Sequence, residues 1–237
     1  MTHLDQGTGA AGIKVLCSNS LHAVMEELVP AFERASGHKV SISYDTAILT
    51  LSRIKSGEIA DLVILNAPAI DELTKQGRIA PGSRCTLARC GVGIAVRAGA
   101  PKPDISSVEA FKRALLDAKS IAHTEAGASG IHFAGVIERL GIAAQVKAKA
   151  RTRPGGLIGE LVAKGEAELA VQQIPELMAV AGIDLVGPLP PELQLTTTVT
   201  AAVFADARQP DAAQALLAFL STPAAARVFK AHGLEPG

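Results

Sequence analysis

The stretch Ile13-Lys14-Val15-Leu16-Cys17-Ser18-Asn19-Ser20 decides the fold, because an apolar strand runs directly into a small polar turn. Behind the turn, apolar residues recur with helical spacing at Leu21, Val24, Met25, Leu28, Val29 and Phe32. Two later segments repeat the arrangement: Ile121-Ala122-His123 leads into Gly127-Ala128-Ser129-Gly130, and Leu169-Ala170-Val171 ends at Gln172-Gln173 before Ile174-Pro175-Glu176. The sequence therefore predicts three strands, each followed by a polar turn that opens a helix.

Each of these turns combines features that bind anions without a formal positive charge. The first backbone N–H groups of a helix lack partners within the helix, the helix dipole favours negative charge there, and hydroxyls add donors. Ordinary helix capping also explains any single turn, because Ser and Asn are common N-cap residues. If the turns meet at one cleft, an anion site is favoured, and its candidate residues are Ser18, Asn19, Ser20, Ser129, Gly130 and Gln173.

Composition narrows the possible partners. The 237 residues are 48% hydrophobic, enough for one large α/β domain or two smaller lobes. The 23 basic and 23 acidic residues are well mixed, so we expect no nucleic-acid or anionic-membrane partner. Aromatic residues make up only 3%, which argues against stacking surfaces for bases or sugars. No apolar run approaches the roughly 20 residues of a membrane-spanning helix, so we expect no membrane insertion. The composition as a whole favours a small molecule as the partner, and we expect a monomer.

No cofactor or metal is predicted. The segment Gly91-Val92-Gly93 lacks the rest of a dinucleotide fingerprint and precedes a strand instead of a helix. The spacing of Cys17, Cys85 and Cys90 matches no zinc or redox motif. Cys85 and Cys90 would lie about 16 Å apart on one extended segment, beyond disulfide reach, so free thiols are predicted. Free thiols favour a reducing compartment.

The N-terminal stretch Met1–Gly7 has no charged start followed by an apolar segment, so no signal peptide is predicted in the chain as written. Two histories fit this pattern. Either the natural protein is cytoplasmic, or a leader was removed and replaced by an initiating Met, in which case the protein is periplasmic.

Alternation of strand-like and helix-like segments predicts an α/β fold. The short strand-like runs are 13–16, 39–44, 60–65, 120–123, 148–151, 169–172 and 184–187. Capping signals support the helices between them, since Ser106 and Glu109 predict a capping box and Thr222-Pro223 predicts a helix start.

Two long strand-like segments, Cys85 to Val96 and Leu193 to Phe204, lack an intervening helix, and we interpret them as crossings between two lobes. Lobe one is then 1–88 and 200–237, lobe two is 93–195, and the hinge lies near 89–92 and 196–199. A ligand is expected between the lobes, because open α/β sheets bind at the carboxyl ends of their strands. There Asn66 joins the candidate donors, although Asn66-Ala67-Pro68 is also typical of a plain turn before a helix.

The chain resembles the molybdate-binding-like group of bacterial extracellular solute-binding proteins. The matching segments are Val15 to Leu21, Ile59 to Leu65, Gly91 to Ile105, Gly127 to Gly130, Leu161 to Leu169, Gly187 to Pro190 and Gly233 to Pro236. The resemblance spans almost the whole chain, and its motifs are mostly structural. It implies a type 2 periplasmic-binding-protein fold with two α/β lobes and two hinge crossings, and as partner the permease of an ABC-type importer.

The resemblance also implies ligand positions. Molybdate binders hold a tetrahedral dianion with hydroxyls, backbone N–H groups and a Tyr. Ser20 falls near the serine of the first lobe, Thr46-Ala47 falls where a second serine pair would sit, and Gln173 falls at the position of the Tyr. These replacements change the donor geometry, so a small carboxylate or another oxyanion is favoured over molybdate.

The same group includes aconitate isomerase, an enzyme that moves a double bond in a small tricarboxylic acid by an allylic proton shift. The alternative to a binding protein is therefore an isomerase of a small unsaturated carboxylic acid, which needs a base beside a carbon acid. His123 and Glu176 are the candidate bases, and Arg89 is the candidate cation for a multiply charged ligand. For each, an ordinary structural or surface role is the competing interpretation.

Overall fold

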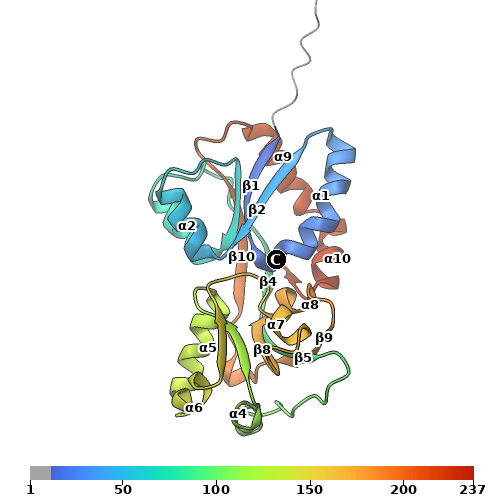
Figure 1. Cartoon of the computed structure of the whole chain (residues 1–237). Coiled ribbons are helices and arrows are strands. Elements are labelled where there is room, and N and C mark those ends of the chain that lie inside the picture. The colour runs from blue at the N-terminus through green and yellow to red at the C-terminus, as the bar shows by residue number, and fades with distance from the viewer. Residues whose placement is uncertain (1–11) are drawn as a thin grey trace, which may run out of the picture.

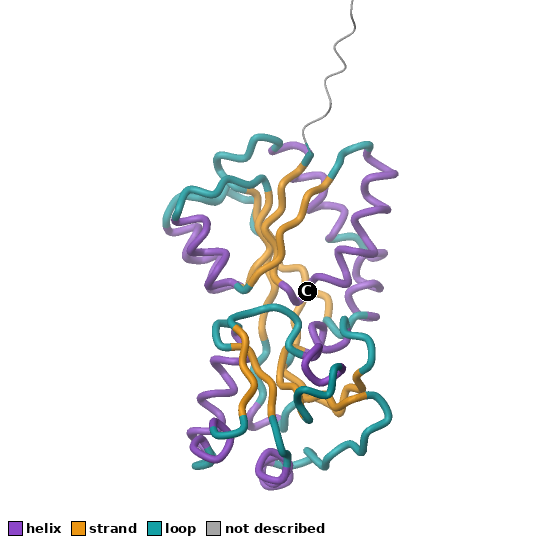
Figure 2. The backbone as a smooth tube through the Cα atoms, in the orientation of Figure 1, coloured by secondary structure: helices purple, strands orange, loops and turns teal. Residues whose placement is uncertain are grey.

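The computed structural model describes residues 12–237, so the expectations for the N-terminal stretch and for the start of lobe one lie outside the described residues. The described chain forms two α/β lobes, one above the other in Figures 1 and 2, and each lobe is built on its own sheet. The predicted fold class is confirmed.

The first sheet has six strands in the order β11-β4-β10-β3-β1-β2. Three of its strands are parallel, since β1 runs parallel to both β2 and β3. Strand β10 lies between β3 and β4 and runs antiparallel to both. The strands are β1 (Ile13–Ser18), β2 (Val40–Asp45), β3 (Leu62–Asn66), β4 (Cys85–Cys90), β10 (Thr197–Val203) and β11 (Glu235–Pro236).

The second sheet has five strands in the order β7-β6-β8-β5-β9. Here β6 is parallel to both β7 and β8, and β5 is antiparallel to β8 and β9. The strands are β5 (Val92–Arg97), β6 (Ile121–Thr124), β7 (Ala150–Arg153), β8 (Leu169–Gln173) and β9 (Ile183–Pro188).

Helices cover both faces of each sheet. Those of the first lobe are η1 (Asn19–Leu21), α1 (His22–Ser36), α2 (Ala47–Lys55), α3 (Ala67–Lys75), α9 (Pro210–Leu220) and α10 (Pro223–Ala231). Those of the second are α4 (Val108–Asp117), α5 (Ala128–Arg139), α6 (Ala143–Lys147), α7 (Gly159–Ala163), α8 (Ile174–Met178) and η2 (Pro191–Leu193). None of the described helices is by itself long and apolar enough to cross a membrane. Helices α9 and α10 taken together reach the required length and hydrophobicity, but they are bent by 65° relative to each other.

Alternation along the strands divides the core of the first lobe into two layers. Val15 and Leu16, adjacent on β1, point to opposite faces because successive strand side chains alternate. Val15 packs among residues of α1, α9 and α10, and Leu16 packs among residues of α2 and α3. The second lobe is layered in the same way, with Ile121 and Ala122 of β6 on opposite faces of its sheet.

The chain crosses between the two sheets twice. The first predicted long segment consists of β4 in one sheet and β5 in the other, and the second brings the chain from β9 back to β10. Gln194 ties the two crossings together, since its amide oxygen accepts from the Val92 N–H at 2.8 Å and its amide nitrogen donates to the Val92 carbonyl at 2.9 Å. That the lobes bend at 89–92 and 196–199 stays a prediction.

The predicted capping box at Ser106 and Glu109 is wrong by one residue. Helix α4 begins after Ser107, whose hydroxyl accepts from the Ala110 N–H at 3.2 Å. Ser106 is instead held by its own N–H, which donates to the Asp104 carboxylate at 2.9 Å. The prediction for α10 is confirmed, with Thr222 as N-cap and Pro in the first turn. The three cysteines are free thiols, as predicted.

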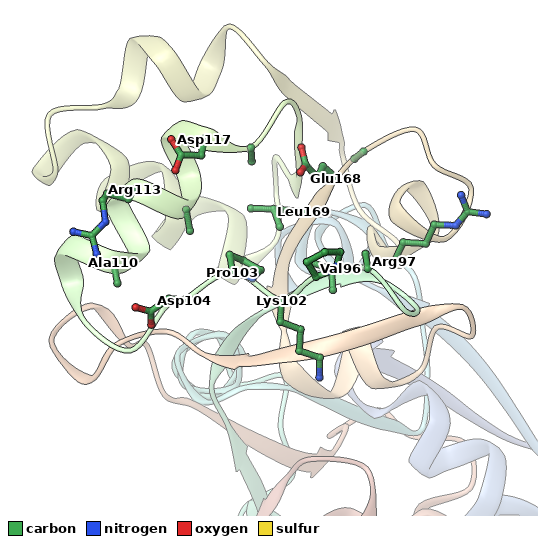
Figure 3. Close-up of a pocket in the computed structure, with 15 residues that line it drawn as sticks. Val96, Arg97, Lys102, Pro103, Asp104, Ala110, Arg113, Asp117, Glu168 and Leu169 are labelled. Atoms are coloured by element: carbon green, nitrogen blue, oxygen red, sulfur yellow. The ribbon is translucent and has the colours of Figure 1, made fainter.

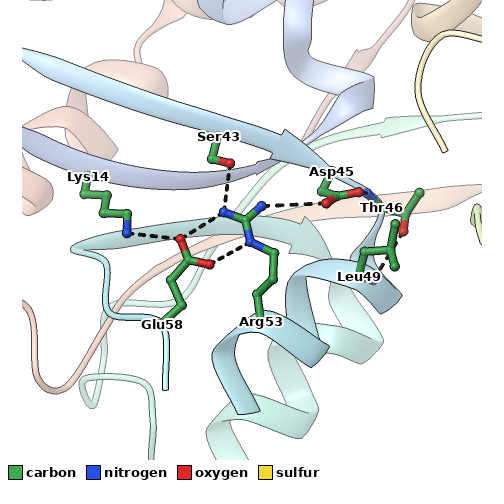
Figure 4. Close-up of polar contacts among 7 residues, drawn as sticks. All are labelled: Lys14, Ser43, Asp45, Thr46, Leu49, Arg53 and Glu58. Atoms are coloured by element: carbon green, nitrogen blue, oxygen red, sulfur yellow. Dashed lines mark hydrogen bonds and ion pairs between the residues drawn. The ribbon is translucent and has the colours of Figure 1, made fainter. Parts of the chain in front are cut away.

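A charged network fixes α2 against the edge of the first sheet (Figure 4). The Arg53 guanidinium contacts both carboxylate oxygens of Glu58, at 2.6 and 2.9 Å, and donates to the Ser43 hydroxyl at 2.9 Å. Lys14 Nζ lies 3.0 Å from Glu58, and Arg53 also lies 3.6 Å from Asp45, the last residue of β2. Hydrogen bonding to Arg53 and Lys14 lowers the pKa of the Glu58 carboxyl to about 2.

Glu58→Gln should therefore destabilise the protein at neutral pH. Because the pKa of Glu58 is lower in the folded than in the unfolded state, its contribution is present above about pH 4.5 and is lost as the pH falls towards 2. We expect the free energy of unfolding to drop by about 1–2 kcal/mol at pH 7, and by much less at pH 3, as measured by urea denaturation. The control is Glu138→Gln, which breaks the exposed Lys147 pair and should cost under about 0.5 kcal/mol. Equal losses in the two variants would contradict this account.

Candidate functional site

The carboxyl ends of strands from both sheets face one another across a small cavity. Polar residues at the ends of β1, β3, β6 and β8 and after β2 supply most of its lining. The lining residues are Ser18, Asn19, Ser20, Thr46, Ala47, Asn66, Thr124, Gly127, Ala128, Ser129, Gly156, Gln172, Gln173, Glu176, Thr197 and Val199. The three predicted strand–turn–helix segments thus meet at one site.

The first lobe contributes hydroxyl and amide groups from the starts of its helices. Ser18 caps η1, and its hydroxyl lies 2.9 Å from the hydroxyl of Ser20. Thr46 and Asn66 cap α2 and α3, where their side-chain oxygens accept backbone N–H groups at 3.3 and 3.0 Å. Asn19 is buried beside them. Ser18, Thr46 and Asn66 therefore both cap helices and line the cavity, two roles between which the sequence alone could not decide.

In the second lobe, the start of α5 lies beside an unpartnered hydroxyl. Helix α5 begins after Gly127, which offers no side-chain cap to the first backbone N–H groups. Ser129 in the first turn is 2% exposed and lines the cavity. Thr124 at the end of β6 is also 2% exposed, and its Oγ1 has no hydrogen-bond partner within the described chain. A ligand oxygen in the cavity would satisfy these donors.

Gly130, predicted as a ligand residue, is outside the cavity lining. Its role is close packing, because a Cβ at this position would lie 1.8 Å from the carbonyl oxygen of Thr124 and 2.8 Å from Thr124 Oγ1. Only glycine lets the first turn of α5 approach the end of β6 this closely.

Gln173 lines the cavity and also joins the two crossings. Its amide oxygen accepts from the Cys90 thiol at 3.3 Å, and its amide nitrogen donates to the Thr197 hydroxyl at 3.3 Å. Cys90 ends β4 and Thr197 begins β10, so one side chain of the second lobe holds both connecting strands. The amide has a second N–H, which leaves one donor for a ligand.

Glu176 is the one ionisable side chain among the described residues that line the cavity. It lies in the first turn of α8 and is 8% exposed. Burial raises the pKa of its carboxyl to about 8, and hydrogen bonds with the Gln172 side chain and the Gln173 backbone offset only part of that rise. The carboxyl can therefore hold or release a proton near neutral pH, as a general acid or base requires.

The other predicted base, His123, does not reach the cavity. It precedes Thr124 on β6 and points to the opposite face of the strand, where its ring lies 5.3 Å from that of Phe133. Its Nδ1 lies 3.1 Å from the Thr124 carbonyl oxygen. His123 is thus part of the packing behind the site.

Arg89 is also outside the cavity. It is an exposed residue of β4, opposite Thr198 of β10 and Glu235 of β11. No Lys, Arg or His is found among the described lining residues, so an anion would be held there by neutral donors and helix starts. No group of three or more His, Cys, Asp or Glu suited to a metal ion occurs between residues 12 and 237.

Eight lining residues were not among the predicted site residues: Ala47, Thr124, Gly127, Ala128, Gly156, Gln172, Thr197 and Val199. Thr124 and Gln172 had an available signal, since Thr124 directly follows the predicted strand 120–123 and Gln172 stands directly beside Gln173. Gly156 and Thr197 enter the site only because the turn after β7 and the second crossing fold over it.

A larger cavity, of about 570 Å³, lies in the second lobe between β5, α4 and the segment joining them (Figure 3). Its floor is apolar, with Val96, Ala110 and Leu169, and its rim carries exposed charges of both signs, including Arg113 and Asp117. Unlike the small cavity between the lobes, this larger cavity is lined by no buried carboxyl group among the described residues, and no helices of the first lobe begin at it. The small cavity between the lobes is therefore the candidate functional site.

Two α/β lobes joined by two crossings, with strand ends facing a cavity between them, define a type 2 periplasmic-binding-protein fold. The family model described as bacterial extracellular solute-binding protein matches residues 13–235. The chain belongs to this family.

Two relatives and two solved structures are similar over nearly the whole chain. Aconitate isomerase of a Pseudomonas species is 38% identical over 230 residues, covering 94% of this chain and 87% of the relative. The molybdate-binding protein ModA of Azotobacter vinelandii is 28% identical over 235 residues, with coverages of 94% and 90%. The structure of the periplasmic molybdate-binding protein of Azotobacter vinelandii superimposes with a TM-score of 0.79 at 20% identity, covering 94% of this chain and 98% of that one. The sulfate-binding protein SubI of Mycobacterium tuberculosis superimposes with a TM-score of 0.75 at 19% identity, with coverages of 95% and 87%.

Proposed function

We propose that this protein is an isomerase of a small unsaturated polycarboxylic acid, with aconitate as the first substrate to test. The observation that carries the proposal is the carboxyl of Glu176, buried in a cavity whose other polar groups are neutral donors. The ionised form of this carboxyl opposes the binding of an anion, so a passive anion site gains less from it than from one more neutral donor. A proton-transfer enzyme, in contrast, needs such a group beside its substrate. The 38% identity to aconitate isomerase supports this choice.

The neutral donors would hold the carboxylate groups of the substrate. The first-lobe group Ser18, Asn19, Ser20, Thr46 and Asn66 supplies hydroxyl and amide groups, and Thr124, Ser129 and Gln173 face them from the second lobe. Each hydrogen bond to a charged carboxylate contributes about 1.5–3 kcal/mol. The starts of α2, α3 and α5 add the partial positive charge that the missing cations would otherwise supply.

The reaction would be an allylic proton shift. The Glu176 carboxylate removes a proton from the methylene carbon next to the double bond, and the C–H electron pair spreads over the allyl unit and its attached carboxylate. The new carboxylic acid of Glu176 then returns a proton to the other end of the allyl unit, and the double bond has moved. Hydrogen-bond donors around the substrate carboxylate stabilise the intermediate charge. The step is balanced without a metal, oxidant or reductant.

Substrate entry would require the lobes to separate. The cavity between them has a volume of about 30 Å³, room for about two water molecules, which is too small for a six-carbon acid. Separation at the two crossings would open the site, and closure around the substrate would remove water from the reacting carbon.

A second candidate function is reversible binding of a small carboxylate or oxyanion, without turnover, for an importer. It is favoured by the helix starts and hydroxyls that meet at the cavity and by the similarity to the molybdate-binding protein. The importer permease and a monomeric state are proposals that come with this candidate.

One set of incubation experiments distinguishes the two functions. The protein is mixed with cis-aconitate, trans-aconitate, citrate, molybdate, sulfate or phosphate, and the melting temperature and the proton NMR spectrum of the ligand are recorded. An isomerase should bring both aconitate isomers to the same equilibrium mixture. A raised melting temperature with an unchanged ligand spectrum would favour the binding protein.

A further inference from the structure

A buried thiol behind the cavity begins a chain of hydrogen bonds that ends at the cavity wall. Cys90 ends β4, is 4% exposed and is not among the described residues that line the cavity. Its thiol donates to the amide oxygen of Gln173 at 3.3 Å, and the amide nitrogen of Gln173 donates to the hydroxyl of Thr197 at 3.3 Å. Gln173 and Thr197 both line the cavity. The chain thus connects a residue outside the site to two polar groups inside it.

The backbone holds these three residues together where the two sheets meet. Cys90 and Thr197 stand directly opposite each other on the antiparallel strands β4 and β10. Gln173 ends β8 and pairs with Val92, two residues beyond Cys90 on the same crossing. Gln173 and Thr197 are buried like Cys90, so water competes little for the hydrogen bonds between the three side chains.

The Cys90 thiol sets the direction of the chain. A primary amide can be turned so that either its oxygen or its NH₂ group faces a given neighbour. If the Gln173 amide were reversed, its NH₂ group would face the sulfur, a weak acceptor, and the buried S–H would lose its acceptor. Burial, with a smaller contribution from Glu176, raises the pKa of the Cys90 thiol to about 12, so the hydrogen stays on the sulfur at neutral pH. The NH₂ group therefore faces Thr197 and the cavity.

With this direction, both groups in the cavity wall have a hydrogen to donate. The Gln173 amide has a second N–H besides the one bonded to Thr197. The Thr197 hydroxyl accepts that bond and donates to no other group among the described residues, so its own hydrogen is free for a ligand. Aligned hydrogen bonds polarise one another, which strengthens the last donor of the chain. A negatively charged oxygen is the ligand group that such donors bind most strongly.

We propose that Cys90 is a positioning residue for the ligand: acting through Gln173, it makes this wall of the cavity a donor surface for a carboxylate or oxyanion oxygen. Cys90 itself does not touch the ligand. The direction of the neutral donors matters here because no Lys, Arg or His is found among the described lining residues. The inference rests on the proposed function only for the identity of the anion, since isomerisation and reversible binding both require the anion to be held.

The inference is tested by the affinity of four variants for anions, measured by calorimetry. Cys90→Ala removes the thiol, Cys90→Ser keeps a donor, Gln173→Leu removes the amide, and the fourth variant combines Cys90→Ala with Gln173→Leu. The probes are trans-aconitate, citrate, molybdate and sulfate, and the variants are compared with the probe that the unaltered protein binds most tightly. The control is Cys85→Ala at the other end of β4, where the thiol lies 3.3 Å from the Ser221 hydroxyl.

We expect Cys90→Ala to weaken binding by about tenfold, Cys90→Ser to restore most of the affinity, and Cys85→Ala to match the unaltered protein. When Gln173 is already Leu, Cys90→Ala should cause no further loss, because Cys90 acts through the amide. If Cys90→Ala does not fold, Cys90→Val, which fills the space of the thiol without a donor, takes its place.

Unchanged affinity in Cys90→Ala, or an equal loss with and without the Gln173 amide, would overturn the inference and leave the proposed isomerase standing. An anion that binds without conversion would disprove the isomerase and leave the comparison of affinities intact. Binding of none of the probes would overturn both.

Discussion

Glu176→Gln is expected to lose isomerase activity while keeping the ability to bind the ligand. The amide cannot take a proton from carbon, so the rate should fall by about 10²–10⁴-fold, the usual contribution of a positioned general base. Binding of the anionic ligand should be unchanged or tighter, because a potential negative charge is removed from the cavity. The rate is measured by proton NMR and the affinity by calorimetry.

The same variant makes a prediction about stability. Because the pKa of Glu176 is higher in the folded than in the unfolded state, the fold is favoured while the carboxyl is protonated, and that advantage is lost as the pH rises from about 4.5 to about 8. We expect Glu176→Gln to be more stable than the unaltered protein at pH 8.5 by about 2–4 kcal/mol, and nearly equal to it at pH 4.5.

A matched control for both measurements is Glu160→Gln. Glu160 lies on α7 in the second lobe, paired with Arg153 at 3.2 Å and partly exposed to solvent. This variant should keep its activity and show no gain in stability at high pH. If Glu176→Gln retained the full rate, Glu176 would not be the base and the proposed mechanism would be wrong.

Gly130→Ala is expected to cause a large loss of stability. The new methyl group would lie 1.8 Å from the Thr124 carbonyl oxygen, and this contact is with backbone, so it cannot be relieved by a side-chain rotation. We expect the free energy of unfolding to fall by about 2–4 kcal/mol, as for overpacking at a rigid position, when measured by urea denaturation.

Gly135→Ala in the same helix provides the comparison. An added Cβ there meets nothing within 4 Å, and alanine is favoured over glycine inside a helix, so the protein should gain about 0.5–1 kcal/mol. If the two variants had similar stabilities, the close approach of α5 to β6 would not be a constraint on the fold.

The arrangement of strands and helices could be predicted because hydrophobic periodicity is a local property of the sequence. The run from Ile13 to Ser18 alternates between two helical layers, and the polar turn after it opens a helix, as expected. The predicted N-cap of α4 was one residue too early, because the adjacent Ser106 and Ser107 offer the same capping group. Only the hydrogen bond from the Ser106 N–H to Asp104 decides between them.

The candidate site was predictable only where it coincides with strand ends. Ser18, Asn66 and Gln173 end strands of the two sheets, so their meeting follows from the topology. His123 was expected in the site but lies one residue before Thr124, and a shift of one residue along a strand reverses the direction of the side chain. The polar group at the site is therefore Thr124.

Glu176 illustrates what local patterns leave open. An acid in the first turn of a helix is usually an exposed residue that interacts with the helix dipole, and the sequence gives no sign that this one is buried. Its burial comes from the packing of α8 between η1 of the first lobe and β5 and β9 of the second. Contacts between lobes depend on the complete fold, so the shifted pKa of Glu176 could not be predicted.

The most direct test of the proposed function is the exchange of substrate hydrogen with solvent. The unaltered protein is incubated with trans-aconitate in D₂O, and deuterium at the methylene and vinyl carbons is followed by proton NMR. The proposal predicts the appearance of cis-aconitate at a rate that rises towards pH 8. Deuterium enters the methylene and vinyl carbons to the extent that the proton on Glu176 exchanges with solvent before it is returned. Trans-aconitate that binds but is never converted to cis-aconitate, and keeps all of its hydrogen after long incubation, would contradict the isomerase and favour a carboxylate-binding protein.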